Sequence, residues 1–216
     1  MRFPDRMIHL ATTRAAAALA ALFLVAAPAA AQSLIDIPAE TATARAGKWV
    51  VTTDSTASGG QRTMRHPDEG AAKLTSALSS PTNYFEVTFS ASAGVPYQLV
   101  VLGKADQNYW GNDSVFVQFS GSVDASGTPR FRIGSSDATV VSLEDCSGCG
   151  EQGWGWNDNG YGYLADSLYF AASGPQTIRV LRREDGISID QVVLSAGRFL
   201  SAAPGAAKND TTIVPK

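Results

Sequence analysis

The stretch from Gly153 to Tyr163 concentrates side chains that suit contact with a sugar. It sets two Trp and two Tyr among Gly, Asn and Asp residues. Aromatic rings offer flat apolar faces for the C–H groups of a sugar ring, and amides and carboxylates hydrogen-bond to its hydroxyl groups. We therefore predict that this loop binds a ligand through Trp154, Trp156, Asn157, Asp158 and Asn159.

A second segment repeats this chemistry. Tyr109, Trp110 and Asn112 stand close together around Gly111, and we predict that these three side chains also bind the ligand. The alternative is that the aromatic rings close the ends of a hydrophobic core, because Trp is usually largely buried. The solvent exposure of the Trp side chains distinguishes the two interpretations.

The two cysteines, Cys146 and Cys149, have Cys-x-x-Cys spacing. A zinc site would need two further ligands, and the chain has no second Cys pair or His pair to supply them. A redox-active pair belongs at the start of a helix in a βαβ unit, which this sequence does not suggest. We predict a local disulfide of an exported protein, whose short loop adds little stability.

Catalysis has sparse support in the sequence. His66 is the one His outside the N-terminal segment, and no Gly-x-Ser-x-Gly motif is present, so a Ser-His-Asp site is disfavoured. Glu144, Asp145 and Glu151 are candidates for a pair of carboxylates that hydrolyses a glycosidic bond. We assign no catalytic residue, and keep a polysaccharide-active enzyme as an alternative.

The elements that must position these residues are β-strands. Apolar and polar residues alternate over 84–89, which places Phe85, Val87 and Phe89 on one face. Asp185-Gly186 between two β-rich runs predicts a hairpin. About ten such runs at turn spacing, without a convincing amphipathic helix, predict an all-β fold: an antiparallel β-sandwich or jelly roll.

The N-terminus has the three-part organisation of a secretory signal. Arg residues precede an apolar run over 15–27, and small Ala residues follow up to Ala31. The run is shorter than the roughly 20 residues of a membrane span. We therefore predict a signal peptide at 1–31, cleaved after Ala31, and a secreted or periplasmic protein.

Composition narrows the possible partners. The 216 residues are 44% hydrophobic and 17% charged, which is too apolar for a disordered chain. A net charge of −3 without a basic stripe argues against a nucleic-acid partner.

No later run reaches the length of a membrane span. We expect a monomer with a folded domain at 33–200, and a flexible C-terminal tail at 201–216.

Three stretches resemble the galactose-binding-like β-sandwich modules: 37–40 with 57–60, 112–119, and 183–194. Within that group the chain is similar to carbohydrate-binding modules of families six and thirty-five, and to an uncharacterised exported bacterial subgroup. The resemblance spans residues 35–195. It implies a jelly roll of two antiparallel sheets and non-catalytic binding of a polysaccharide or another glycan. A structural or adhesion module of the cell surface, with the aromatic loop on a protein, is the alternative.

The resemblance also implies a structural calcium ion. In the family, an acidic residue of the first strand and the Asp of the last hairpin help to hold it, and these match Glu40 and Asp190. Carboxylate oxygens are the hard ligands that calcium prefers. Pro38 stands where the family prefers Glu, so one expected carboxylate is missing. Ordinary surface acids are the alternative.

Overall fold

The computed structural model describes residue 1 and residues 34–58 and 61–214. The predicted signal peptide lies outside these residues except for Met1, so its cleavage stays a prediction. In the described part of the chain, no helix is long and apolar enough to cross a membrane.

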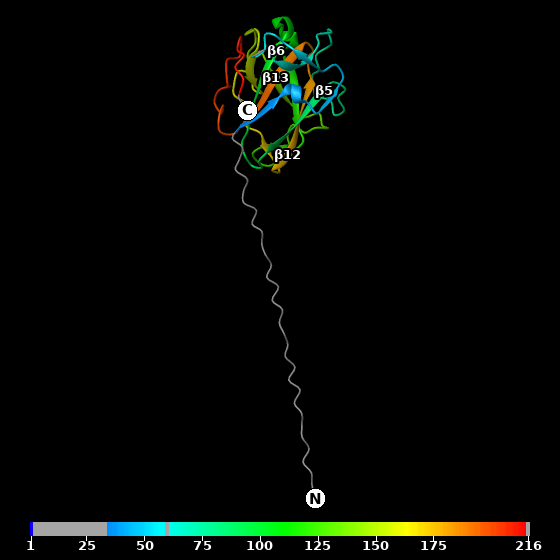
Figure 1. The fold of residues 1–216 in the computed structure, drawn as a ribbon, viewed down its shortest axis with the longest axis vertical. Helices are drawn as coiled ribbons and strands as arrows, with labels where there is room; N and C mark the ends of the chain where they lie inside the picture. The colour runs from blue at the N-terminus through cyan, green and yellow to red at the C-terminus, as the bar shows by residue number, and fades with distance from the viewer. Residues whose placement is uncertain (2–33, 59–60, 215–216) are drawn as a thin grey trace.

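Two antiparallel sheets stack against each other, and a short two-stranded ribbon lies beside them (Figure 1). The first sheet has the order β10-β6-β13-β4-β3, with β1 also paired to β13. Its strands are β1 (Leu34–Pro38), β3 (Val50–Thr53), β4 (Arg62–His66), β6 (Gln98–Ala105), β10 (Gly155–Asp158) and β13 (Ile187–Ser195).

The second sheet has the order β2-β5-β12-β7-β9. Its strands are β2 (Ala44–Ala46), β5 (Tyr84–Ala91), β7 (Ser114–Phe119), β9 (Thr139–Ser142) and β12 (Gly174–Arg182). The ribbon consists of β8 (Ser122–Val123) and β11 (Tyr169–Phe170). The described residues also form the 3-10 helices η1 (Ala39–Thr41), η3 (Asp106–Asn108) and η4 (Trp110–Asn112). The predicted all-β fold is confirmed.

The main core lies between the two sheets. The alternation predicted over 84–89 holds in β5, where Phe85, Val87 and Phe89 are buried in this core. From the facing sheet, Leu99 and Val101 of β6 point into the same cluster. Burial of these apolar side chains, at about 25 cal/mol per Å² removed from water, is the main stabilising contribution to the sandwich.

The predicted hairpin at Asp185-Gly186 is wrong. Strand β12 pairs with β5 and β7 in the second sheet, whereas β13 pairs with strands of the first sheet. The segment between them therefore crosses from one sheet to the other. Gly186 still makes a turn, with φ of +70°, and Asp185 accepts hydrogen bonds from the backbone N–H groups of Glu69 and Ala71. The local turn signal is correct, but it says nothing about which strands pair.

The C-terminal segment is not a flexible tail over residues 201–214. Val214 is buried, and its N–H donates to Oε1 of Gln191 at 2.9 Å. The N–H of Asp210 donates to the carbonyl oxygen of Trp154, at 2.8 Å. The outer face of the first sheet carries apolar side chains, among them Val193, and the segment covers them. A covering segment is needed because this face would otherwise expose a contiguous apolar patch.

Candidate functional site

Trp154 and Trp156 are buried, with only 2% and 1% of their surface exposed. Both rings belong to the apolar cluster on the outer face of the first sheet, which the C-terminal segment covers. Their indole N–H groups donate to Thr56 Oγ1 at 3.2 Å and to the carbonyl oxygen of Thr212 at 2.8 Å. The prediction that these two rings face a ligand is therefore wrong.

Gly155 shows why this aromatic stretch can be covered so closely. A Cβ atom at this position would lie 1.8 Å from the carbonyl oxygen of Ala207. The N–H of Trp156 donates to the carbonyl oxygen of Ala206 at 2.9 Å. Glycine here serves the approach of the C-terminal backbone.

The other residues predicted to bind the ligand fall into two groups: some are buried or half-buried, and others lie near open surface. Asn157 and Asn112 are buried, and Nδ2 of Asn112 donates to Asp68 Oδ2 at 3.2 Å. Asp158 is half-buried; burial raises its pKa, and its Oδ1 accepts from the N–H of Gly160 at 2.7 Å. Asp158 and Asn112 therefore hold the local backbone, whereas no hydrogen-bond partner is found for Asn157 Nδ2 among the described residues. Asn159, Tyr109 and Trp110 are the predicted residues that the structure leaves near open surface, and we treat them below.

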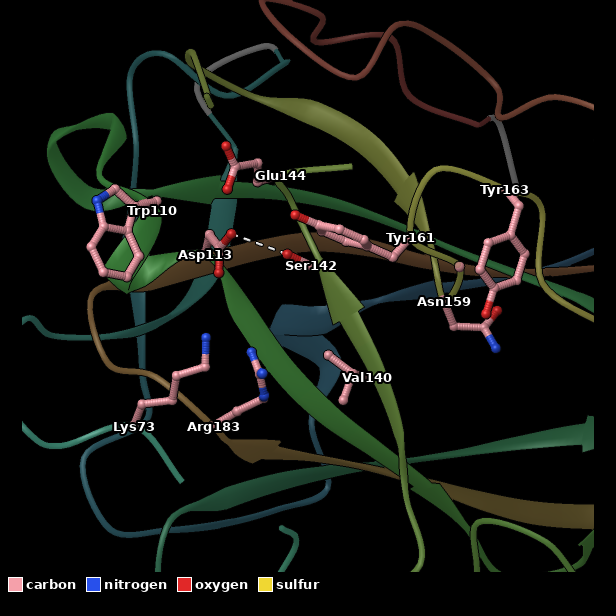
Figure 2. Close-up of a pocket in the computed structure, with 11 residues that line it drawn as sticks. Lys73, Trp110, Asp113, Val140, Ser142, Glu144, Asn159, Tyr161, Tyr163 and Arg183 are labelled. Carbon is pink, nitrogen blue, oxygen red and sulfur yellow. Dashed lines mark hydrogen bonds between the residues drawn. The ribbon is translucent and has the colours of Figure 1, made fainter. Parts of the chain in front are cut away.

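A pocket of about 380 Å³ lies between η4, strand β9 and the loop that follows β10 (Figure 2). It includes two of the predicted binding residues, Trp110 and Asn159. Its lining consists of Lys73, Trp110, Asp113, Val140, Ser142, Glu144, Asn159, Gly160, Tyr161, Tyr163 and Arg183. Ligand sites commonly occupy about 300–1,000 Å³ and combine apolar walls with a few polar groups, which this pocket also does.

The wall at Trp110 rests on an unusual backbone. Gln107 and Asn108, just before it, have positive φ values of 61° and 50°. Such values are uncommon outside glycine and persist where surrounding contacts fix them. Oδ1 of Asn108 accepts from the N–H of Gly153 at 2.8 Å. The loop thereby holds Trp110 with 59% of its surface exposed, beside the half-exposed ring of Tyr109 at a centroid distance of 5.2 Å.

The opposite wall comes from Tyr161 and Tyr163, which are 49% and 68% exposed. In Figure 2, Trp110 and Tyr161 lie on either side of Asp113. A Cβ atom at Gly160 would lie 1.7 Å from the carbonyl oxygen of Tyr163, so glycine allows the loop to fold back on itself. The two Tyr side chains project from this folded loop.

Cys146 and Cys149 form the predicted pair, with their Cα atoms 5.3 Å apart. The loop they close lies next to Glu144, whose Oε1 accepts from the N–H of Gly150 at 2.9 Å. Lys208 donates from the C-terminal segment to the carbonyl oxygen of Cys149. The cysteine pair therefore fixes the loop that carries Glu144 into the pocket.

Asp113, which lines the pocket, forms an acidic pair with Glu184. Burial, followed by the hydrogen bond and charge of Glu184, raises the pKa of Asp113 to about 8. Burial opposes ionisation of Glu184, but hydrogen bonds with Asp113, Lys73 and Ser114 lower its pKa. Lys73 Nζ lies 2.7 Å from Glu184 Oε1. At neutral pH, the shared proton therefore resides on Asp113 and the charge on Glu184.

This arrangement predicts a loss of stability as the solution becomes alkaline. Asp113 binds its proton more tightly in the folded than in the unfolded state. Its contribution to the free energy of unfolding therefore falls as the pH rises from about 4 to about 8. Urea unfolding from about pH 6.5 to about pH 8.5 should show this decline in wild type, and a smaller one in Asp113→Asn. Asp190, with a pKa of about 6, is mostly ionised throughout that range. Equal declines in the free energy of unfolding of wild type and Asp113→Asn would contradict the raised pKa of Asp113.

Two carboxyl groups of the pocket, those of Asp113 and Glu144, form a group with Glu151 that could hold an ion. Oxygen atoms of Asp113, Glu144 and Glu151 all lie within 4.8 Å of one another. Glu144 and Glu151 were predicted only as candidate acids for hydrolysis, and Asp113 was not among them. Asp145, the third acid named there, accepts instead from the N–H of Gly162 at 2.9 Å.

A second group of acids surrounds Asp190, in β13. Burial raises the pKa of Asp190 to about 6, and the charges of Glu40, Asp36 and Asp54 add to this effect. Among the described residues, no hydrogen-bond partner is found for the buried atoms Glu40 Oε2 and Asp190 Oδ2. A buried acceptor without a donor is costly unless a cation or ligand satisfies it. Glu40 and Asp190 thus offer two oxygen atoms of the kind that the calcium site implied by the family resemblance needs, and the charge of Asp36 also acts on Asp190.

The fold and the pocket together define an antiparallel β-sandwich with an aromatic and carboxyl-lined site beside one edge strand. No protein-family model matches the chain, and no curated protein does. Among solved structures, the chain is similar to the Podospora anserina GH26-CBM35 β-(1,4)-mannanase, with a TM-score of 0.47 and 13% identity over 76% of this chain and 27% of that one. It therefore spans about a quarter of the length of that enzyme.

Two isolated modules are also similar. The family 35 carbohydrate-binding module from Clostridium thermocellum gives a TM-score of 0.41 and 16% identity, over 75% of this chain and 98% of the module. The C-terminal CBM6 of the laminarinase LamC from Zobellia galactanivorans gives a TM-score of 0.42 and 11% identity, over 75% of this chain and 98% of the module. These likenesses concern the fold.

Sequence reasoning missed several residues of the pocket. Lys73, Asp113 and Arg183 come from three distant segments that meet only in the folded chain. Tyr163 stood inside the aromatic loop that was singled out, but it was not named as a contact. Its position in a Gly- and Asn-rich stretch was the available signal, because no strand alternation predicts that it is buried there.

Proposed function

We propose that this protein binds carbohydrate, without changing it chemically, in the pocket between Trp110 and Tyr161. The observation that carries this proposal is the pair of exposed aromatic side chains on either side of hydrogen-bonding groups. The apolar faces of a sugar ring can lie against the aromatic rings while its hydroxyl groups meet Asp113, Ser142 and Asn159. The resemblance to carbohydrate-binding modules of families six and thirty-five supports the same function.

The electrostatics favour a ligand rich in hydroxyl groups. Lys73 is paired with Glu184, and Asp113 carries a proton at neutral pH, so much of the charge around the floor of the pocket is compensated. Ser142 Oγ donates to Asp113 Oδ2 at 3.0 Å and keeps lone pairs that can accept from a ligand. The pocket thus offers both donors and acceptors, as hydroxyl groups require.

The test is retention on polysaccharides. Purified protein should be retained by at least one of three insoluble polymers, a β-1,4-mannan, a β-1,3-galactan or a β-1,3-glucan, and a soluble form of the same polymer should release it. The cell-surface alternative predicts binding to a protein instead. Failure to bind any of the three polymers, with the protein shown to be folded by circular dichroism, would contradict the proposal.

One observation favours a second function, hydrolysis of a glycosidic bond. The protonated Asp113 and the carboxyl group of Glu144 lie near each other beside the aromatic walls, and glycosidases use such a pair of acids. Incubation with a retained polysaccharide and measurement of new reducing ends decides between binding and hydrolysis. Release of reducing ends by wild type, but not by Glu144→Gln, would replace the binding proposal with the enzymatic one.

Calcium bound by Glu40 and Asp190 is the proposed structural cofactor. The ion would satisfy Glu40 Oε2 and Asp190 Oδ2, and would pin η1 against β13. A ligand that binds only the folded state adds about 2.7 kcal/mol of stability at a hundredfold excess over its Kd.

We expect calcium to raise the melting temperature and a chelator to lower it. Asp190→Asn should remove the difference between the two conditions, because one of the two buried ligand atoms loses its charge. Glu144→Gln, in the separate group of acids at the pocket, is the matched control and should keep the difference. Loss of the calcium effect in Glu144→Gln alone would place the ion in the pocket instead.

Export completes the proposed function, with cleavage after Ala31 and a secreted or periplasmic location. The paired cysteines support it, because such pairs persist in oxidising compartments. N-terminal sequencing of protein recovered outside the cytoplasm should begin at Gln32. Recovery of a chain that still carries residues 2–31 would refute cleavage.

A further inference from the structure

A second, larger pocket of about 820 Å³ adjoins the candidate site. Asn159 and Tyr163 line both pockets. The edge strand β9 also contributes to both, because Val140 and Ser142 face the first pocket and Thr139 faces the second. Because successive side chains of a strand point to opposite faces, the two hollows lie on the two faces of the edge strand β9, and they share the loop with Asn159 and Tyr163 as their common wall.

That common wall is tied to the strand. Asn159 Nδ2 donates to Thr139 Oγ1 at 3.1 Å, which fixes the amide between the two pockets. Asn159 Oδ1 is buried and has no hydrogen-bond partner among the described residues.

The far pocket has a fixed wall of its own. Phe131 has a φ of 52°, and its N–H donates to Asp137 Oδ2 at 2.6 Å. Its carbonyl oxygen accepts from the N–H of Phe119 at 2.7 Å. Arg130 lies beside it on the same wall, with its guanidinium 4.7 Å from the ring centroid of Phe131. Uncommon backbone conformations held by hydrogen bonds thus occur near both pockets.

We propose that the two pockets form one groove that passes over the edge of β9, and that it binds several consecutive sugars of a single polysaccharide chain. This inference rests on the proposed function. Each pocket alone has the volume of a small-ligand site, so a single sugar would leave most of the groove empty. A chain that passes Trp110, Asn159 and Arg130 in turn would contact an aromatic wall, the residue shared by the two pockets and a donor-rich side chain.

The test is titration calorimetry with manno-, galacto- and gluco-oligosaccharides of two to six units. Wild-type affinity should rise about tenfold or more from the disaccharide to the hexasaccharide of the series that binds. Arg130→Gln should remove most of this gain and leave the disaccharide affinity unchanged, because Arg130 lines only the far pocket. Arg45→Gln, on the exposed edge strand β2 at the other side of the same sheet, is the matched control and should keep the gain.

The outcomes separate the groove from the binding function. Equal affinity for disaccharide and hexasaccharide, or a full gain in Arg130→Gln, would overturn the groove while carbohydrate binding stands. No binding of any oligosaccharide or of the three polymers would overturn both.

Discussion

Trp156→Ala is expected to lower the free energy of unfolding by about 3–5 kcal/mol, the usual cost of removing a buried aromatic ring. The ring is fully buried in the outer cluster, where it lies with Trp154, Val193 and Val214. The substitution also leaves the carbonyl oxygen of Thr212 without its indole donor. Urea unfolding followed by circular dichroism measures the loss.

Removal of residues 202–216 also tests the apolar cluster on the outer face of the first sheet, because it takes away the segment that covers the cluster. It should destabilise the protein as well, because the outer face of the first sheet then meets water. Trp110→Ala is the control: its ring is exposed, and surface substitutions usually change stability by about 0.5 kcal/mol or less. A Trp156→Ala protein with wild-type stability would contradict the buried position and restore this ring as a candidate contact.

The fold was predictable because alternation is a local property. In β5 the residues that face the core follow directly from the pattern of apolar side chains. The sheet to which a strand belongs is not a local property. Asp185-Gly186 marks a turn whether or not the flanking strands pair with each other. Only the pairing of β12 and β13 with other strands places them in different sheets. The hairpin prediction failed for this reason.

In the two aromatic segments, too, the local sequence does not determine which distant segment covers a side chain. Trp154 and Trp156 share with Trp110 a setting of Gly and Asn residues, so composition predicts the same role for all three. The structure separates them through the C-terminal segment, some fifty residues further along the chain, which covers the first two and leaves Trp110 open. The spacing of Trp154 and Trp156 on either side of Gly155 was a usable signal, because residues i and i+2 of a strand share a face.

Removal of the exposed ring of Trp110 should have the largest effect on carbohydrate binding. We expect Trp110→Ala to weaken binding to the retained polysaccharide by about thirtyfold or more, equivalent to about 2 kcal/mol, because buried aromatic contacts dominate binding sites. Trp110→Phe keeps a flat apolar face and should lose much less. The comparison isolates stacking from any change in the backbone at Gln107 and Asn108.

Affinity and melting temperature must be measured on the same proteins. Trp110→Ala should combine weak binding with near-wild-type stability, and Trp156→Ala should combine low stability with binding that follows the folded fraction. Tyr161→Ala should resemble Trp110→Ala, because its ring forms the opposite wall and is half-exposed. If Trp110→Ala and Tyr161→Ala both bound as tightly as wild type while carbohydrate was still retained, the sugar would have to bind at another face of the sandwich, and the aromatic pocket would lose its assigned role.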